Sequence, residues 1–252
     1  MIGVGTAMRC EDYDGLSTLI STEQSIVTVF FDHNPGNMVK YGVEDYGVFL
    51  KDFTAHLGTL IPVCHDTTPK IILGGHSASG RAGFQALMHD EDLTADGFIS
   101  LDGFQVSGTA KWGIGPNNIP KTIIAEDLPV LAWGFETQTC SVDPKKGGKA
   151  AYELSNDGHR VFFRVQNGAR GSRVGHCEFT DEGCGIFACK TRSPQNNDVK
   201  TVIAQSIQIF ATGIVHGRKV TRADYDRLDT SNDTVNIEVY INTDTVQEQT
   251  EL

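Results

Sequence analysis

The feature that most constrains the fold of this chain is a regular alternation between short apolar runs and segments with helical periodicity. The apolar runs occupy residues 26–31, 70–75, 96–104, 128–136 and 159–166. Segments that repeat apolar side chains every three or four positions lie at residues 43–62, 80–92 and 198–215. Strands that are apolar throughout are buried on both faces, and strands separated by helices run parallel. The sequence therefore predicts an α/β fold, with a mostly parallel sheet and helices on both of its faces.

The charge and the apolar runs of the chain argue against two classes of partner. The 252 residues carry a formal net charge of −11 and contain no cluster of lysine and arginine, which disfavours nucleic-acid binding. No run approaches the roughly 20 apolar residues that cross a bilayer, so we expect no transmembrane segment. Residues 1–15 lack the basic start and the apolar core of a signal peptide.

The acidity gathers at the C-terminal end, which suggests a division of the chain. Residues 221–252 contain eight acidic and two basic residues. Within them, residues 235–241 alternate between apolar and polar side chains, a pattern typical of a strand with one buried face. We therefore expect an α/β domain at 1–220 and an acidic C-terminal extension at 221–252, with an edge strand at 234–242.

Six cysteines are present, and three of them lie close to a histidine. Cys177, Cys184 and Cys189 follow His176, but no two cysteines have the C-x2-C spacing that many structural zinc sites use. We therefore predict neither a metal site nor another cofactor. Two states stay open for the cysteines, namely buried free thiols and one or two disulfides.

The apolar run at 70–75 leads into the segment GHSASG, which has the residues of a nucleophile site. A serine on a sharp turn between strand and helix needs small residues two positions before and after it, because the backbones crowd there. Gly75 and Ser79 hold these positions around Ser77. The alternative is an ordinary serine in a glycine-rich turn. We favour a nucleophile, because a base and an acid follow in the order that such sites use.

A serine hydroxyl needs a base, and His176 is the strongest candidate. It lies in a glycine-containing loop after the apolar run at 159–166, where an imidazole could reach the edge of the sheet. His76 is next to Ser77, but we expect its side chain to point elsewhere and to pack or hydrogen-bond locally. The predicted base is therefore His176.

Three carboxylates could hold that histidine in the right tautomer. Asp102 ends the apolar run at 96–104, and Glu136 ends the run at 128–136. Asp143 is a weaker third choice. The pattern alone does not decide between the first two.

The remaining parts of such a site are oxyanion donors and a substrate pocket. The amide of Ala78, at the start of the helix after Ser77, and the amide of Thr6 or its neighbour Ala7 are the expected donors. Near the strand ends, Phe104, Trp112 and Phe135 could line an apolar pocket, or they could belong to the core.

Together these residues resemble the α/β-hydrolase fold, and within it the chlorophyllases, over most of residues 1–220. Chlorophyllases carry the elbow GHSRGG, where this chain has GHSASG. They place a glycine eight residues before a tyrosine that opens a helix in a Tyr-x-x-Leu pattern, as Gly5 and Tyr13 do here. Their acid ends the strand after the elbow helix, which favours Asp102, and their histidine lies about a hundred residues after the serine, as His176 does.

The chain also departs from this family. Ala78 and Ser79 replace the arginine and the glycine of the elbow, and Val4 stands where the family has a histidine. The α/β-hydrolase fold has strands before the oxyanion loop, whereas this chain begins almost in that loop. We therefore expect the N-terminal strands of the fold to be missing.

The resemblance implies a serine carboxylic-ester hydrolase that converts chlorophyll to chlorophyllide and phytol. The partner would then be an apolar, lipid-like ester, and the compartment would be the plastid. A general lipase-like or polyester-hydrolase-like esterase, cytoplasmic or secreted, is one alternative. A non-catalytic protein that binds a hydrophobic ligand is the other, motivated by the altered elbow and the missing strands.

Overall fold

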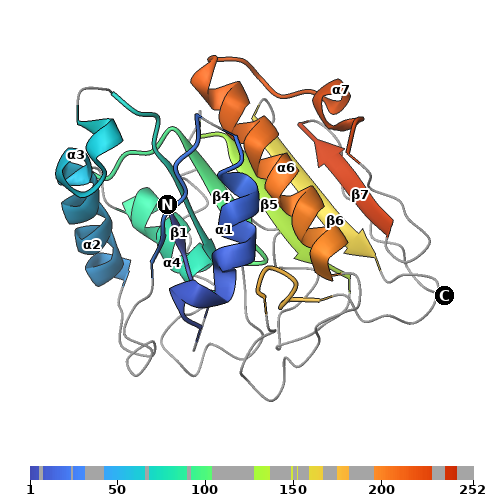
Figure 1. Cartoon of the computed structure of the whole chain (residues 1–252), viewed down its shortest axis with the longest axis horizontal. Coiled ribbons are helices and arrows are strands. Elements are labelled where there is room, and N and C mark those ends of the chain that lie inside the picture. The colour runs from blue at the N-terminus through green and yellow to red at the C-terminus, as the bar shows by residue number, and fades with distance from the viewer. Residues whose placement is uncertain are drawn as a thin grey trace.

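A parallel sheet forms the centre of the molecule (Figure 1). The computed structural model describes residues 1–5, 8–23, 25–31, 43–65, 68–89, 92–103, 128–136, 149, 152, 159–166, 175–181, 196–228 and 236–242. Within these residues the sheet has seven strands in the order β2-β1-β3-β4-β5-β6-β7. The strands are β1 (Ile2–Gly3), β2 (Phe30–Phe31), β3 (Ile72–His76), β4 (Gly97–Leu101), β5 (Val130–Phe135), β6 (Arg160–Gln166) and β7 (Asn236–Ile241).

Helices cover both faces of this sheet. They are η1 (Cys10–Tyr13), α1 (Asp14–Ile20), α2 (Val43–Ala55), α3 (Leu57–Leu60), η3 (Pro62–Cys64), α4 (Ala78–His89), α6 (Asn196–Val215) and α7 (Arg222–Tyr225). Helices α1 and α6 lie together on one face, while α2 and α4 pack together on the other (Figure 1). None of the helices in the described ranges is both long and apolar enough to cross a membrane.

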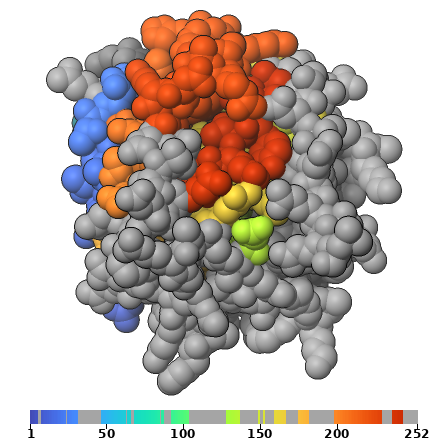
Figure 2. All heavy atoms as spheres, turned by 90° about the vertical axis from the view of Figure 1, so that its right-hand side faces the viewer, coloured from blue at the N-terminus to red at the C-terminus, as the bar shows by residue number. Residues whose placement is uncertain are grey.

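All neighbouring strands pair in parallel except β6 and β7, which pair antiparallel at the edge of the sheet. This confirms the predicted α/β class with a mostly parallel sheet. Strand β7 lies within the predicted edge strand, whose residues 234 and 235 are outside the described part. Figure 2 views the molecule from this edge and shows β7 in red beside β6 in yellow. The strand extends the sheet, so this part of the acidic extension packs directly against β6.

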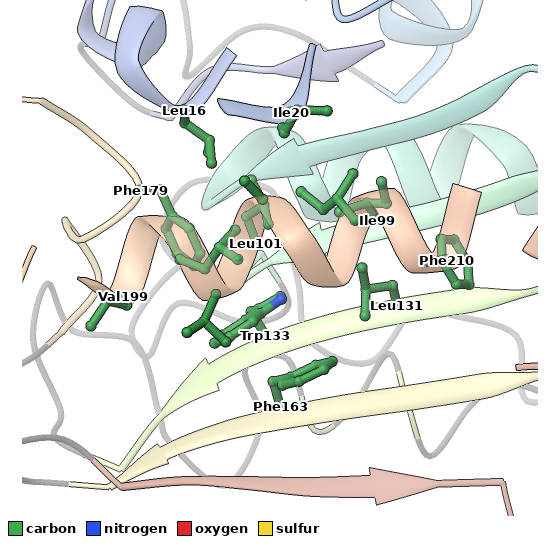
Figure 3. Close-up of a cluster of buried hydrophobic side chains, with 14 of the residues drawn as sticks. Leu16, Ile20, Ile99, Leu101, Leu131, Trp133, Phe163, Phe179, Val199 and Phe210 are labelled. Atoms are coloured by element: carbon green, nitrogen blue, oxygen red, sulfur yellow. The ribbon is translucent and has the colours of Figure 1, made fainter. Parts of the chain in front are cut away.

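The sheet separates two hydrophobic cores, because successive side chains of each central strand point to opposite faces. In β5, Leu131 and Trp133 enter the core beneath α1 and α6, while Val130 and Ala132 enter the core beneath α2 and α4. The larger core is centred on Trp133, whose ring stacks on Phe163 at 4.5 Å (Figure 3). Burial on both faces explains why these strands are apolar throughout.

Two of the sequence-based boundaries were wrong. Of the apolar run at 26–31, only Phe30–Phe31 forms a strand, because β2 is an edge strand that pairs with the two residues of β1 alone. The periodic segment at 43–62 is divided at His56, whose backbone leaves the helical conformation. As a result Leu60 belongs to a separate short helix and is 55% exposed.

The strand order reverses between β1 and β3. Strand β1 lies between β2 and β3, so the chain leaves β1 toward one side of the sheet and returns to continue on the other. Ligands of open α/β sheets bind at such a point, where the strand order reverses. Gly5 follows β1 and Ser77 follows β3, so the fold places both segments at this switch point.

Candidate functional site

Ser77 occupies a strained turn between β3 and α4. Its backbone φ is 58°, in the left-handed region that non-glycine residues rarely adopt. Its N–H donates to Leu101 O at 3.2 Å, and its own carbonyl accepts the N–H of Arg81 at 3.4 Å. The first bond extends the pairing of β3 with β4, and the second starts the helix. Such strain costs about 1–3 kcal/mol and persists only where the surroundings enforce it.

Three glycine backbones enforce this turn. A Cβ atom on Gly75 would lie 2.4 Å from the nitrogen of Gly80, and one on Gly103 would lie 2.7 Å from Gly80 Cα. The Gly75 Cβ would also lie 2.4 Å from the carbonyl carbon of Ser79, so the crowding that predicts a small residue at Ser79 extends to Gly80. The Ser79 side chain is buried, and its Oγ donates to Val4 O at 2.5 Å.

Asp102 and His176 form a buried hydrogen-bonded pair. The two atoms His176 Nδ1 and Asp102 Oδ2 are 2.7 Å apart, and both side chains are 4% exposed. Asp102 follows β4 with a φ of 48°, and its N–H donates to Trp133 O at 2.9 Å. Because a carboxylate only accepts, the His176 proton is on Nδ1, and Nε2 of the neutral ring has a lone pair that can take a proton.

Glu136, the other candidate acid, has a different partner. It follows β5 and is half-buried, and its carboxylate lies 3.6 Å from the guanidinium of Arg164 on β6. Arg164 also approaches Glu238 on β7 at 3.8 Å. Glu136 thus takes part in an ion-pair group across the last three strands. Asp143 lies outside the described residues.

The segment 175–181, which carries His176, is anchored in several ways. Phe179 is fully buried in the larger core (Figure 3), and its ring centroid lies 5.0 Å from that of His76 and 5.4 Å from that of Phe135. The N–H of Asp181 donates to Asp12 O at 2.7 Å, which ties the segment to η1. Cys177 is in a disulfide whose second cysteine lies outside the described residues, whereas Cys10 and Cys64 form no disulfide. The open question of the cysteines is thereby answered for these three.

A further anchor is an ion pair between Asp181 and Lys200 of α6. Lys200 Nζ donates to Asp181 Oδ1, and the second carboxylate oxygen accepts the N–H of Gly15 at 2.8 Å. Lys200 is 5% exposed. A buried ammonium needs its counter-ion, because a charge without one is costly away from water.

We expect Asp181→Asn to lower the free energy of unfolding by about 1–3 kcal/mol, because the buried Lys200 would lose its counter-ion. The partial exposure of Asp181 to solvent keeps this loss moderate. Urea unfolding followed by circular dichroism would measure this loss. Lys200→Met, which removes the charge and its need for a partner, should cost less. Equal stability of Asp181→Asn and the wild type would contradict the role of the pair.

His76 is the residue whose part in this site was missed. Its Nδ1 lies 2.5 Å from the hydroxyl of Tyr13, and its Nε2 lies 2.9 Å from the carbonyl oxygen of His176. The centroids of the His76 and His176 rings are 4.4 Å apart. Of the two predicted alternatives, His76 does pack, against the rings of His176 and Phe179, but its hydrogen bonds are not local, because their partners are 63 and 100 residues away. The spacing of Gly5 and Tyr13 was the one available signal, since Gly5 N–H donates to Tyr13 Oη at 2.9 Å.

Of the other predicted site residues, two lie in the described part of the chain. Ala78 is the first residue of α4, so its N–H points out of the helix end without an intrahelical acceptor. Phe135 is buried in the larger core, with its ring edge-on to Phe179. Phe135 therefore packs as a core residue. Thr6, Phe104 and Trp112 lie outside the described residues.

A pocket of about 340 Å³ opens at the opposite end of the sheet. Its lining includes Lys70 and Asp96, which precede β3 and β4, and Arg218, which follows α6. Lys70 is paired with Asp96 at 2.9 Å, and Arg218 with Asp224 at 2.8 Å, so these charges are balanced within the chain. Among the described residues, no three histidine, cysteine or acidic side chains come together as metal ligands.

The sequence matches no protein-family model and no curated protein. The site is therefore characterised by its geometry: a serine on a left-handed turn and a buried histidine–aspartate pair, gathered where parallel strands end.

Proposed function

We propose that the protein is a serine hydrolase that cleaves carboxylic esters. The observation that carries this proposal is the buried hydrogen bond of 2.7 Å between His176 Nδ1 and Asp102 Oδ2. It lies at the carboxyl ends of the central strands, where Ser77 takes its left-handed turn. A histidine held by a carboxylate is the base that a serine nucleophile needs, and a strained turn after a strand is where α/β-hydrolases present that serine.

In the proposed reaction, Ser77 Oγ attacks the ester carbonyl carbon while His176 Nε2 takes the hydroxyl proton. Asp102 stabilises the resulting imidazolium, and the amides of Ala78 and Thr6 bind the oxyanion. The C–O bond of the ester then breaks, and His176 protonates the departing alcohol. Water repeats the sequence on the acyl-enzyme and releases the acid.

The proposed substrate is chlorophyll, a propionate ester of a long isoprenoid alcohol, and the proposed products are chlorophyllide and phytol. Support comes from the resemblance of the elbow GHSASG and of the spacing from Ser77 to Asp102 and His176 to those of chlorophyllases. On this proposal the chain has the α/β-hydrolase fold.

Covalent labelling tests the nucleophile. A fluorophosphonate probe should label the wild type, and Ser77→Ala should abolish the labelling, because the probe reacts only with an activated serine. Mass spectrometry of the labelled peptide would locate the adduct. Ser79→Ala is the matched control in the same turn, and it should still be labelled. Labelling that persists in Ser77→Ala would assign the nucleophile to another residue.

Product analysis on a panel of esters tests the substrate. We would offer chlorophyll, a triglyceride and a short-chain p-nitrophenyl ester to the wild type and to Ser77→Ala. Phytol release by the wild type alone supports the chlorophyllase-like function. Turnover of the other two esters without chlorophyll would indicate a general esterase. Tight pigment binding without any turnover would contradict hydrolysis and indicate a binding protein.

A further inference from the structure

A continuous chain of hydrogen bonds connects the loop after β1 to the segment that carries His176. It runs from Gly5 N–H to Tyr13 Oη at 2.9 Å, from Tyr13 to His76 Nδ1 at 2.5 Å, and from His76 Nε2 to His176 O at 2.9 Å. Tyr13 and His76 are 0% and 1% exposed. The chain thus joins three segments that are remote in sequence through two buried side chains.

The proton positions in this chain follow from its two ends. A backbone carbonyl only accepts, so the N–H at His76 Nε2 donates to His176 O, and Nδ1 must accept. The hydroxyl of Tyr13 therefore donates to His76 and accepts from Gly5. Burial, and then the neighbouring ring of His176, hold the pKa of His76 well below its usual range, which keeps this ring neutral. Burial also raises the pKa of Tyr13, which keeps its donor proton.

Both ends of this series of hydrogen bonds lie beside groups of the proposed mechanism. Gly5 directly precedes Thr6, whose amide is a proposed oxyanion donor, and Gly5 O accepts the N–H of Met8 at 3.1 Å. His176 is the proposed base, and the bond to its carbonyl fixes the backbone from which its ring extends. A Cβ atom on Gly5 would lie only 2.7 Å from His76 Nδ1, so loop and ring are in close contact.

We propose that Tyr13 and His76 form a positioning unit that sets the oxyanion loop and the backbone of His176 at a fixed distance from each other. This inference rests on the proposed function, because it assigns these residues a task in the same reaction. Neither residue contacts the ester. A misplacement of about 1 Å in either group can cost up to about 100-fold in rate, so a rigid link between them has a direct kinetic effect.

Two substitutions of His76 test its two hydrogen bonds separately, one to Tyr13 and one to the carbonyl of His176. The amide nitrogen of glutamine reaches the place of Nε2, so His76→Gln keeps the bond to His176 O and loses the acceptor for Tyr13. The amide oxygen of asparagine reaches the place of Nδ1, so His76→Asn keeps that acceptor and loses the bond to His176. Tyr13→Phe removes the same bond as His76→Gln, together with the acceptor for Gly5.

We expect Tyr13→Phe, His76→Gln and His76→Asn each to lower kcat on a p-nitrophenyl ester by about 10- to 100-fold with KM nearly unchanged. Fluorophosphonate titration would count the intact sites. The double variant Tyr13→Phe/His76→Gln should be no slower than the slower single variant, because both changes break one bond. Tyr225→Phe is the matched control: its buried hydroxyl has no partner among the described residues, so kcat should be unchanged.

The low-field proton resonance of His176 Nδ1–H, assigned through its loss in Asp102→Asn, gives a readout that needs no turnover. It should stay in His76→Gln and shift or broaden in His76→Asn. Values of kcat within twofold of the wild type together with an unshifted resonance would overturn the positioning unit while Ser77 labelling stands. If Ser77 is not labelled at all, the proposed function fails, and the resonance alone decides whether His76 positions His176.

Discussion

Asp102→Asn should lower kcat for ester hydrolysis by about 10³- to 10⁴-fold, whereas Glu136→Gln should change it by less than about threefold. Asp102 Oδ2 accepts the proton of His176 Nδ1 at 2.7 Å. An asparagine presents an N–H there as readily as an oxygen, which favours the histidine tautomer with its proton on Nε2. That tautomer cannot take the proton of Ser77. Glu136 instead lies 3.6 Å from Arg164, so its neutralisation leaves the base unchanged.

These two substitutions are well matched, because each converts a carboxylate to its amide at the end of one of two adjacent strands. Initial rates on a p-nitrophenyl ester, normalised by fluorophosphonate titration, would give kcat and KM for both variants. Unfolding curves would show whether each variant is folded. A larger loss in Glu136→Gln than in Asp102→Asn would move the role of the acid to Glu136.

The parallel sheet was predictable from the sequence because its physical cause is visible there. Strands β4 and β5 are buried on both faces, so residues such as Ile99 and Leu131 and their neighbours Phe98 and Val130 must all be apolar. Continuous apolar runs of this kind have few other solutions in a chain that alternates them with helices. The edges were less predictable, because β1 and β2 have only two residues each.

The candidate site was predictable only in part. Neighbouring parallel strands have their carboxyl ends side by side, so the residues that follow β3 and β4 had to lie near each other. This reasoning identified Ser77 and Asp102 as candidates. The choice between Asp102 and Glu136 depends on the direction in which each side chain leaves its strand. At Asp102 a left-handed φ of 48° sets that direction, and a backbone dihedral of this kind has no clear signature in one sequence.

The hydrogen bonds of Tyr13 and His76 could not be predicted from the sequence, for a related reason. The partners of His76 lie 63 and 100 residues away, and a histidine gives no sign of which distant carbonyl its Nε2 will reach. Helix η1 and segment 175–181 become neighbours only when the larger core forms around Tyr13 and Phe179. Long-range contacts between polar atoms follow from packing, which periodicity does not describe.

Gly75→Ala should be the most destabilising single substitution at this site, with a loss of more than about 4 kcal/mol in the free energy of unfolding. The new Cβ would lie 2.4 Å from the nitrogen of Gly80 and 2.4 Å from the carbonyl carbon of Ser79. Both are backbone atoms of the first turn of α4, so they cannot rotate away as a side chain can. The helix would have to move off the sheet, and the left-handed turn at Ser77 would lose the contacts that enforce it.

Gly97→Ala is the control that separates this effect from simple overpacking. Gly97 is paired with Ile72 on the neighbouring strand, and a Cβ there would meet the side chains of Ile214 at 2.5 Å and Phe210 at 3.3 Å. Side chains can adjust, so we expect a loss of about 1–3 kcal/mol and normal fluorophosphonate labelling. Urea unfolding would compare the two variants. Similar losses in both would mean that the close approach of Gly75 to α4 does not hold the turn, and the strain at Ser77 would then need support from the Ser79–Val4 bond or from Gly103.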